Sequence, residues 1–243
     1  MIYILLPCYN EYKNLLPLIK KINKIPQHNK INILLVNDGS TDETHKNIIF
    51  LRKISRNNII YIQHKKNQGL NIALLSGFKK IISIGRSNDI VFTMDSDNTH
   101  PVGLINKMSK LINLNSFDIV IASRFKLGGK VKGLSFFRSF LSQAARFIFK
   151  SLINIKNVND YTCNYRAYKY DILKKSKLIN KNFFLDKDFS IAADLLININ
   201  KRITNLNICE VPLILRYDKK IGESKMNVGR TILKTFSLIF KNF

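Results

Sequence analysis

Cysteine is scarce in this chain of 243 residues, and its positions do not suit a stabilising framework. Cys8, Cys163 and Cys209 are odd in number and form neither a C-x-x-C pair nor a cluster with histidine. This argues against a disulfide-rich secreted domain and fits a reducing compartment. Hydrophobic residues make up 46% of the chain, so one domain can bury a substantial core without such cross-links.

Long apolar runs are also missing. No run reaches the roughly 18 residues that a membrane-spanning helix needs, so we expect no transmembrane helix. The first residues, MIYILLPCYNEYK, contain a short apolar run without a basic leader or a small-residue cleavage site. We interpret them as a buried first strand and expect no signal peptide.

Acidic residues are few: the chain has 16 of them against 40 lysines and arginines, for a formal net charge of +24. This surplus predicts attraction to an anionic partner such as nucleic acid, an acidic lipid surface or a phosphorylated substrate. The alternative is a basic, solvated surface without a partner. The placement of the charges has to decide between these interpretations.

Short apolar segments alternate with segments of helical period in the first half of the chain. Strands are predicted at residues 2–6, 31–36, 59–63, 90–94 and 119–122, and helices at residues 15–22, 43–54, 70–84 and 104–114. The predicted strands are rich in β-branched residues, as strands buried on both faces are. The alternation predicts a parallel α/β arrangement.

The second half is less regular. A mobile loop is predicted at residues 128–133, an amphipathic helix at 134–155, a polar segment at 160–166, a helix near 186–199, a strand-like stretch at 208–215 and a helical tail at 226–243. The helix at 134–155 and the tail combine an apolar face with basic residues, which is the pattern of helices lying in a membrane interface. Packing of both helices on the protein's own core is the alternative.

Acidic residues follow three of the predicted strands. The loops are PCYNE after the first strand, NDGSTD after the second and DSD after the fourth. In parallel α/β sheets ligands bind beyond the carboxyl ends of the strands, so we expect these loops to converge on one site.

The DSD loop has the features of a cation site. Side chains two residues apart in an extended segment point the same way, so Asp95 and Asp97 are expected to face one pocket and Ser96 the opposite side. Paired carboxylates suit a hard ion such as Mg²⁺ or Mn²⁺. Taken alone, the pattern also fits one aspartate capping the next helix and the other in solvent.

Eight stretches follow one another along nearly the whole chain: LPCYNE, VNDGSTDET, NQGLNIALLSGF, MDSDNTHP, IASRF, DYTCNYRAY, CEVPLILR and GESKM. Together and in this order they resemble family 2 glycosyltransferases of the GT-A fold, and within that family the polyprenyl- or dolichyl-phosphate sugar synthases. The resemblance implies a Rossmann-like, three-layer α/β/α fold with a mostly parallel central sheet. It also implies one domain over residues 1–225, with a nucleotide-sugar-binding half at 1–97, an acceptor half at 98–225 and a basic amphipathic helix at 226–243.

The resemblance further implies roles for single residues. The donor would be bound by Pro7, Tyr9, Glu11, Val36, Asp38 and Asp95, with Gly69 and Ala73 packing nearby. Mg²⁺ or Mn²⁺ would be held by Asp95, Asp97 and Thr99, and the acceptor phosphate by Arg124, Arg138, Ser142, Lys219 and Lys225. Asp95, Asp97 and Arg124 are the predicted catalytic residues.

Three positions depart from the family pattern. Asn37 stands where an aspartate is common, Thr99 where many members have a glutamine metal ligand, and Lys219 where arginine is common. Lysine presents a point charge in place of a forked double contact with phosphate. The family's late-helix acid is either Asp188 or Asp194 in this chain.

The predicted reaction is an inverting transfer of a sugar from a nucleotide sugar, GDP-mannose or a UDP-hexose, to a polyprenyl phosphate. A lipid phosphate is already anionic and needs positioning more than a base. His100, beside a proline, is expected to be a turn or supporting residue. We expect a peripheral protein at the cytoplasmic membrane face, with a separate membrane-anchor subunit as a further expected partner.

Three alternatives stay open. The same fold acting on a carbohydrate hydroxyl would need a base, for which Asp186, Asp188 or Asp194 are candidates. A basic nucleic-acid-binding protein would show base-reading elements, which we do not find, so we expect no nucleic-acid partner. An inactive relative would bind substrates without turnover.

Overall fold

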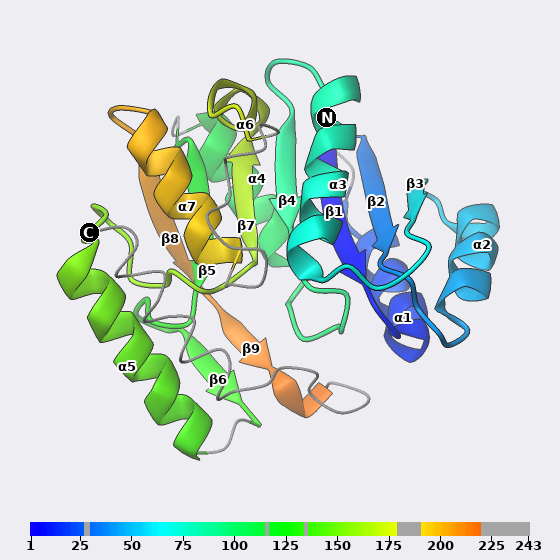
Figure 1. Ribbon diagram of the computed structural model, residues 1–243, viewed down its shortest axis with the longest axis horizontal. Coiled ribbons are helices and arrows are strands. Elements are labelled where there is room, and N and C mark those ends of the chain that lie inside the picture. Colours follow the sequence, from blue (N-terminus) through cyan, green and yellow to red (C-terminus); the bar gives the residue numbers. More distant parts are fainter. Residues whose placement is uncertain (27–29, 115–116, 134–135, 179–190, 220–243) are drawn as a thin grey trace.

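A seven-stranded sheet organises the chain, in the order β3-β2-β1-β4-β7-β5-β8 (Figure 1). The computed structural model describes residues 1–26, 30–114, 117–133, 136–178 and 191–219. The strands are β1 (Ile2–Cys8), β2 (Ile31–Asn37), β3 (Asn58–Gln63), β4 (Ile90–Thr93), β5 (Ile119–Ser123), β7 (Arg166–Lys169) and β8 (Ile208–Pro212). All run parallel except β7, which is antiparallel to both β4 and β5. The prediction of a mostly parallel α/β sheet is confirmed.

Helices cover both faces of this sheet. They are α1 (Tyr12–Asn23), α2 (Thr44–Ile54), α3 (Leu70–Ile84), α4 (Leu104–Leu114), α5 (Phe136–Leu152), α6 (Tyr170–Lys175) and α7 (Ile191–Arg202). One core cluster joins the sheet to α3, α6 and α7, and a second joins it to α1, α2 and α4. The three-layer α/β/α arrangement is therefore confirmed.

Helix α1 shows why the sequence folds this way. Its buried apolar residues are Leu15, Leu18, Ile19 and Ile22, which repeat every three or four positions and so form one stripe along the helix. Strand β1 is buried along its whole length, as expected for a strand between two covering layers. These two local patterns together fix the first βα unit.

The predicted mobile loop at residues 128–133 was wrong at its centre. Strand β6 (Lys130–Lys132) pairs in parallel with β9 (Ile214–Arg216) in a small second sheet. The stretch predicted as one strand at 208–215 divides at Leu213, whose N–H donates to the Ser123 carbonyl and whose carbonyl accepts from Lys130 N–H. Each hydrogen-bond partner lies more than 80 residues away, so neither local pattern could reveal the pairing.

Strand β7 and helix α6 were missed at residues predicted only as a polar segment and its continuation. Arg166, the first residue of β7, is completely buried. Its guanidinium donates to the carbonyls of Tyr161 and Ala192, so a charged residue occupies a strand position that usually holds an apolar one. Because a charged residue stands at this buried position, a search for runs of apolar residues does not find the strand.

Two predicted helices are described only in part. Helix α5 lies within the predicted range 134–155, and α7 begins at Ile191, inside the range predicted near 186–199. The predicted helical tail at 226–243 lies outside the described residues. Within the described ranges, no helix combines the length and apolar character needed to span a bilayer.

Gly77 allows α3 to approach β1 closely, and enlarging it tests this packing. A Cβ at Gly77 would overlap Leu5 Cδ1, and Leu5 is fully buried. Overpacking typically costs about 1–3 kcal/mol, whereas alanine gains about 1 kcal/mol over glycine inside a helix. We expect Gly77→Ala to lower the free energy of unfolding in urea. Gly103→Ala, where a Cβ meets no atom within 4 Å, is the matched control and should change the free energy of unfolding little. Equal free energies of unfolding for the two variants would contradict this packing.

Candidate active site

The carboxyl edge of the main sheet, where its parallel strands end, gathers the polar residues. Cys8 pairs with Asn37 at the ends of β1 and β2, and Thr93 at the end of β4 pairs with Arg166. Because β7 is reversed, it begins at this edge, and residues 160–165 before it lie next to the DSD loop. The three acidic loops therefore converge as predicted.

The DSD loop is anchored on its Ser96 side. Ser96 Oγ donates to the Pro7 carbonyl at 2.6 Å, so this side chain points toward β1 and away from solvent. Asp97 is 8% exposed and its Oδ1 accepts from the Thr99 hydroxyl at 2.7 Å. Asn98 has a left-handed φ of 63°, and its side-chain oxygen accepts from Lys21 Nζ at 2.7 Å. The loop is thus held from both sides.

Two neighbouring side chains support Asp95. Asn164 was not predicted as a site residue, and His100 was expected only as a turn or supporting residue. Asn164 Nδ2 donates to Asp95 Oδ1 at 3.2 Å. His100 Nδ1 accepts the Asp95 N–H at 3.1 Å, which places the proton of a neutral ring on Nε2, 3.7 Å from Asp95 Oδ2. His100 also stacks on Tyr165 at 5.0 Å between ring centres. His100 is a buried supporting residue, as expected.

The loop could hold a divalent cation only with help from a ligand or water. Its donors are two carboxylates and the Thr99 hydroxyl, which are the hard oxygen ligands that Mg²⁺ and Mn²⁺ prefer. Among the described residues, no group of three or more His, Cys, Asp and Glu side chains could hold a metal ion. Phosphate oxygens of a donor would suit the open positions, so the residues present fit the predicted ion.

The loops after β1, β2 and β3 are tied together on the predicted donor side. Asn10 N–H donates to Ser40 Oγ at 2.9 Å, and Thr41 N–H donates back to Asn10 Oδ1 at 2.8 Å. Asp38 is 3% exposed and its carboxylate accepts the N–H groups of Gln68 and Gly69. Three separate segments therefore form one continuous rim.

The other predicted donor residues divide into rim and floor. Glu11 is buried, and its Oε2 accepts from Asn14 Nδ2 at 2.7 Å. Tyr9 is half-buried. Pro7 is buried, and Val36 and Ala73 are fully buried in one core cluster, so they lie beneath the rim and contribute packing.

On the predicted acceptor side, Arg124 is held by a buried carboxylate. Arg124 Nε donates to Asp160 Oδ2 at 2.8 Å and Nη2 to Asp160 Oδ1 at 2.6 Å, while Nη2 also reaches Thr162 Oγ1 at 2.6 Å. Asp160 is fully buried and the Arg124 side chain is 13% exposed. Within the described part of the chain these bonds involve Nε and Nη2 but not Nη1, which leaves Nη1 able to meet an anion.

The ion pair outweighs the cost of burial. Burial by itself would raise the pKa of Asp160, but the charge and hydrogen bonds of Arg124 hold that pKa below its usual range. Burial would likewise lower the pKa of Arg124, and Asp160 raises it instead. Both side chains are therefore charged at neutral pH.

Glu210 supports this ion pair from β8 and was not predicted. Its Oε1 accepts the N–H groups of Asn159 at 2.6 Å and Asp160 at 2.8 Å, and its Oε2 accepts from Asn159 Nδ2. An acid inside the apolar run CEVPLIL was the available sequence signal.

Tyr217 was also missed, and Arg146 was considered only as a basic residue of the predicted amphipathic helix at 134–155. Burial, followed by the nearby Asp95 carboxylate, raises the pKa of Tyr217 to about 12, so its hydroxyl keeps its proton. Arg216 N–H just before it donates to the Thr99 carbonyl at 3.2 Å, which joins β9 to the DSD loop. The guanidiniums of Arg124 and Arg146 lie 5.2 and 5.0 Å from the Phe125 ring centre. Two cations therefore meet at one ring near this edge.

Several predicted residues cannot be placed. The side chains of Arg138 and Lys219, and all of Lys225, Asp186 and Asp188, lie outside the described residues. Ser142 lies on α5, one turn before Arg146. Asp194 is 1% exposed in the first turn of α7, and its carboxylate accepts from Asn198 Nδ2 at 2.7 Å.

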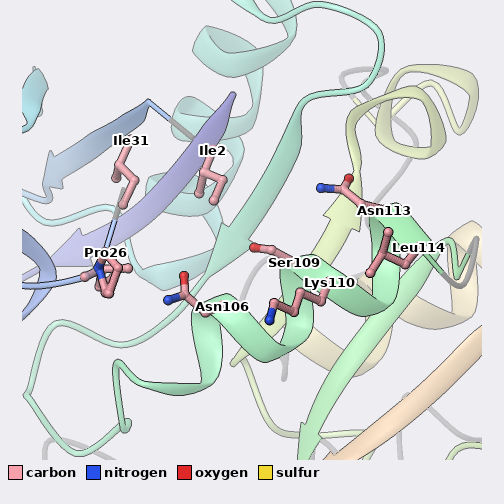
Figure 2. Close-up of a pocket in the computed structure, with 9 residues that line it drawn as sticks. Ile2, Pro26, Ile31, Asn106, Ser109, Lys110, Asn113 and Leu114 are labelled. Atoms are coloured by element: carbon pink, nitrogen blue, oxygen red, sulfur yellow. The ribbon is translucent and has the colours of Figure 1, made fainter. Parts of the chain in front are cut away.

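A pocket of about 310 Å³ lies at the opposite edge of the sheet (Figure 2). Ile2 and Ile31 at the starts of β1 and β2 face Asn106, Ser109 and Lys110 of α4 across it. Its described lining contains no acid, so it offers a cation no carboxylate, in contrast to the carboxyl edge.

Known proteins share this sequence pattern and architecture. A family model described as "Glycosyl transferase family 2" matches residues 3–176. The dolichol-phosphate mannosyltransferase of Pyrococcus furiosus is 28% identical over 98% of this chain, which spans only 62% of that relative. The UDP-N-acetylglucosamine–dolichyl-phosphate N-acetylglucosaminyltransferase of Methanococcus voltae is 29% identical over 99% of this chain and 94% of its own length. The crystal structure of glucosyl-3-phosphoglycerate synthase from Mycobacterium tuberculosis, with Mn²⁺ and UDP, matches 98% of this chain and 79% of its own with a TM-score of 0.68 and 19% identity.

Removing the Asp160 carboxylate should destabilise the chain and change its response to acid. Breaking one side of a buried ion pair costs about 3–5 kcal/mol, so Asp160→Asn should lower the free energy of unfolding at neutral pH by that order. Because the pKa of Asp160 is lowered on folding, the pair stabilises the fold above about pH 4 and this stabilisation is lost as pH falls further. The wild type should therefore lose more stability on acidification than the variant does.

Urea titrations at neutral and acidic pH measure both effects. Asp218→Asn, which removes the exposed partner of Arg216, is the control and should have little effect at either pH. If the Asp160→Asn variant is as stable as the wild type at neutral pH, the role assigned to the ion pair is refuted.

Proposed function

The chain belongs to glycosyl transferase family 2 and is a glycosyltransferase of GT-A-like α/β fold, and from this premise we propose that it transfers a sugar from a nucleotide sugar to a polyprenyl phosphate. The proposed transfer is metal-dependent and inverts the anomeric centre. The observation that carries the proposal is a placement at one sheet edge: Asp160 holds the cation Arg124, and Asn164, four residues further along, contacts Asp95 of the pair Asp95 and Asp97.

Two relatives support the acceptor class. The names of the two relatives differ in the sugar, mannose in one and N-acetylglucosamine in the other, but both include a dolichol or dolichyl phosphate. We therefore commit to a polyprenyl or dolichyl-type phosphate and leave the sugar, mannose or another hexose, to be measured. The proposed nucleotide is GDP or UDP.

Asp95 and Asp97 would hold the divalent cation, with Thr99 close by. A bound Mg²⁺ or Mn²⁺ neutralises charge that develops on a diphosphate leaving group, which is worth several kcal/mol in metal catalysis generally. Asn164 and His100 keep Asp95 in place, while Thr99 and the loop backbone hold Asp97. On the rim beside them, Tyr9, Glu11, Asp38 and Gly69 would bind the nucleoside.

Arg124 would position the acceptor. A phosphate monoester is anionic at neutral pH and attacks without losing a proton, so its main requirement is orientation beside the sugar carbon. Asp160 and Thr162 fix the guanidinium so that Nη1 can point at that phosphate. Arg138, Ser142, Lys219 and Lys225 are proposed to complete the acceptor site.

Helix α5 would bring the enzyme to the lipid. It lies with β6 and β9 beyond the carboxyl edge of the main sheet (Figure 1). Phe140 and Phe147, seven residues apart, are 62% and 74% exposed, and Arg146 and Lys150 lie on the same helix. Exposed aromatic residues among basic ones are typical of a helix in the interface of an anionic membrane.

The proposed reaction is tested with the whole chain, Mg²⁺, a polyprenyl phosphate and a panel of nucleotide sugars. We expect one nucleotide sugar to give a glycosyl lipid phosphate, and Asp97→Asn to lower this activity at least a hundredfold because the cation loses a carboxylate ligand. Asp118→Asn, which removes the ion-pair partner of Lys169 at the far edge, should keep it. A product formed only with a saccharide acceptor would move the function to carbohydrate hydroxyls, and full activity of Asp97→Asn would refute the metal site.

Membrane binding is tested by co-sedimentation with vesicles of anionic or neutral lipid. The double change Phe140→Ser and Phe147→Ser should weaken binding to anionic vesicles by about tenfold or more, since burying a phenylalanine contributes about 1.5–3 kcal/mol. Phe50→Ser, at a 51% exposed phenylalanine of α2, is the control. Equal binding by the double variant would exclude this face of α5.

A further inference from the structure

A chain of polar contacts joins α3 to the donor side of the carboxyl edge. Ser76 Oγ lies 3.0 Å from His64 Nε2, and His64 Nδ1 lies 2.7 Å from Asp38 Oδ1. The same Oδ1 accepts Gln68 N–H at 3.0 Å, and Oδ2 accepts Gly69 N–H at 2.8 Å. The Asp38 carboxylate therefore has three protein donors.

The order Ser–His–Asp is also that of a hydrolase triad, but the setting differs. Ser76 lies inside α3, whose backbone N–H groups are used along the helix. A triad needs free donors beside its nucleophile to stabilise an oxyanion. These polar contacts therefore act on Asp38, which lies at the other end of the series Ser76–His64–Asp38.

Asp38 is a buried carboxylate without a fixed cation. It is 3% exposed and His64 is 8% exposed, and no lysine or arginine of the described chain pairs with Asp38. A buried carboxylate is costly unless donors surround it. Without the ring, Oδ1 would keep only the Gln68 N–H, and one of the three protein donors that orient the carboxylate would be lost.

The loop that carries His64 is pressed against the loop that carries Asp38. Gly39 has a φ of 66°, and a Cβ there would overlap the Lys66 backbone. Gly69, with a φ of 93°, is the N-cap residue directly before α3. The close approach sets the ring of His64 between Asp38 and Ser76, within the rim that is proposed to bind the donor.

We propose that His64 is a positioning residue for the donor nucleoside, an inference that rests on the proposed function. His64 and Gln68 occupy Oδ1, so the second lone pair of Oδ2 is the acceptor left for the nucleoside. An ionised carboxylate only accepts hydrogen bonds. It therefore suits a base that presents a ring N–H, as uracil and guanine do, and disfavours the ring-nitrogen acceptors of cytosine and adenine.

Two substitutions separate the functions of the ring. An asparagine amide can place its N–H near Nδ1, whereas a glutamine amide reaches only to the position of Nε2. His64→Asn thus keeps the donor to Asp38 and loses Ser76, and His64→Gln does the reverse. His45→Gln, at an exposed histidine of α2 that contacts Tyr61, is the control.

Calorimetry on the whole chain would measure binding of UDP, GDP, CDP, ADP and inorganic pyrophosphate, each with Mn²⁺. We expect UDP or GDP to bind most tightly. His64→Gln should weaken that nucleotide about tenfold and His64→Asn less than threefold, with pyrophosphate binding unchanged in both. Weaker nucleotide binding with unchanged pyrophosphate binding distinguishes a loss of Asp38 positioning from general damage to the site.

The outcomes separate the two proposals. If the wild type binds no nucleoside diphosphate, the proposed function fails and this inference falls with it. If the wild type binds UDP or GDP but His64→Gln binds as tightly as His64→Asn, or loses pyrophosphate equally, only the role of His64 is overturned. Should His64→Gln fail to fold, His64→Leu, which also removes the donor to Asp38, gives the same comparison with His64→Asn. About tenfold weaker nucleotide binding with unchanged pyrophosphate binding is expected, and binding as tight as that of His64→Asn would overturn the role.

Discussion

Strand β7 runs against both of its neighbours, and this reversal decides which residues meet at the carboxyl edge. A parallel strand in its place would begin at the far edge and would carry its preceding loop away from the DSD loop. Because β7 begins where β4 ends, Asn164 reaches Asp95 and Asp160 reaches Arg124. The acids proposed for the cation and the arginine proposed for the acceptor are therefore neighbours for a topological reason.

Charge is distributed unevenly around this edge. The buried carboxylates Asp160, Asp38 and Glu210 are each surrounded by N–H donors, and they hold protein groups in place. Asp95, with 42% of its side chain exposed, faces outward. This division suits a site in which some acids set the geometry and others meet a cation. The net charge of +24 is consistent with a phosphorylated lipid at an anionic surface.

Local patterns in the sequence were enough for the main sheet and its edge. Apolar, β-branched runs predicted β1 to β5 closely, and the rule that ligands bind at carboxyl ends predicted that the three acidic loops converge. The reversed strand escaped because Arg166 is a buried charge in a strand, and β6 escaped because its partner β9 lies 84 residues further along. The supports of the acids, such as Asn164 and Glu210, depend on these distant pairings. The apolar run around Glu210 could mark it as unusual, but no local pattern could assign its partners.

The central claim is that a divalent cation binds at Asp95 and Asp97 together with a nucleoside diphosphate. Paramagnetic broadening by Mn²⁺ in the amide NMR spectrum of the whole chain measures its position directly. In the presence of UDP or GDP, the signals of residues 95–100 and of Asn164 should broaden first, while those of α4 residues lining the opposite pocket stay sharp. Broadening centred on another part of the chain, with the DSD loop unaffected, would contradict the account.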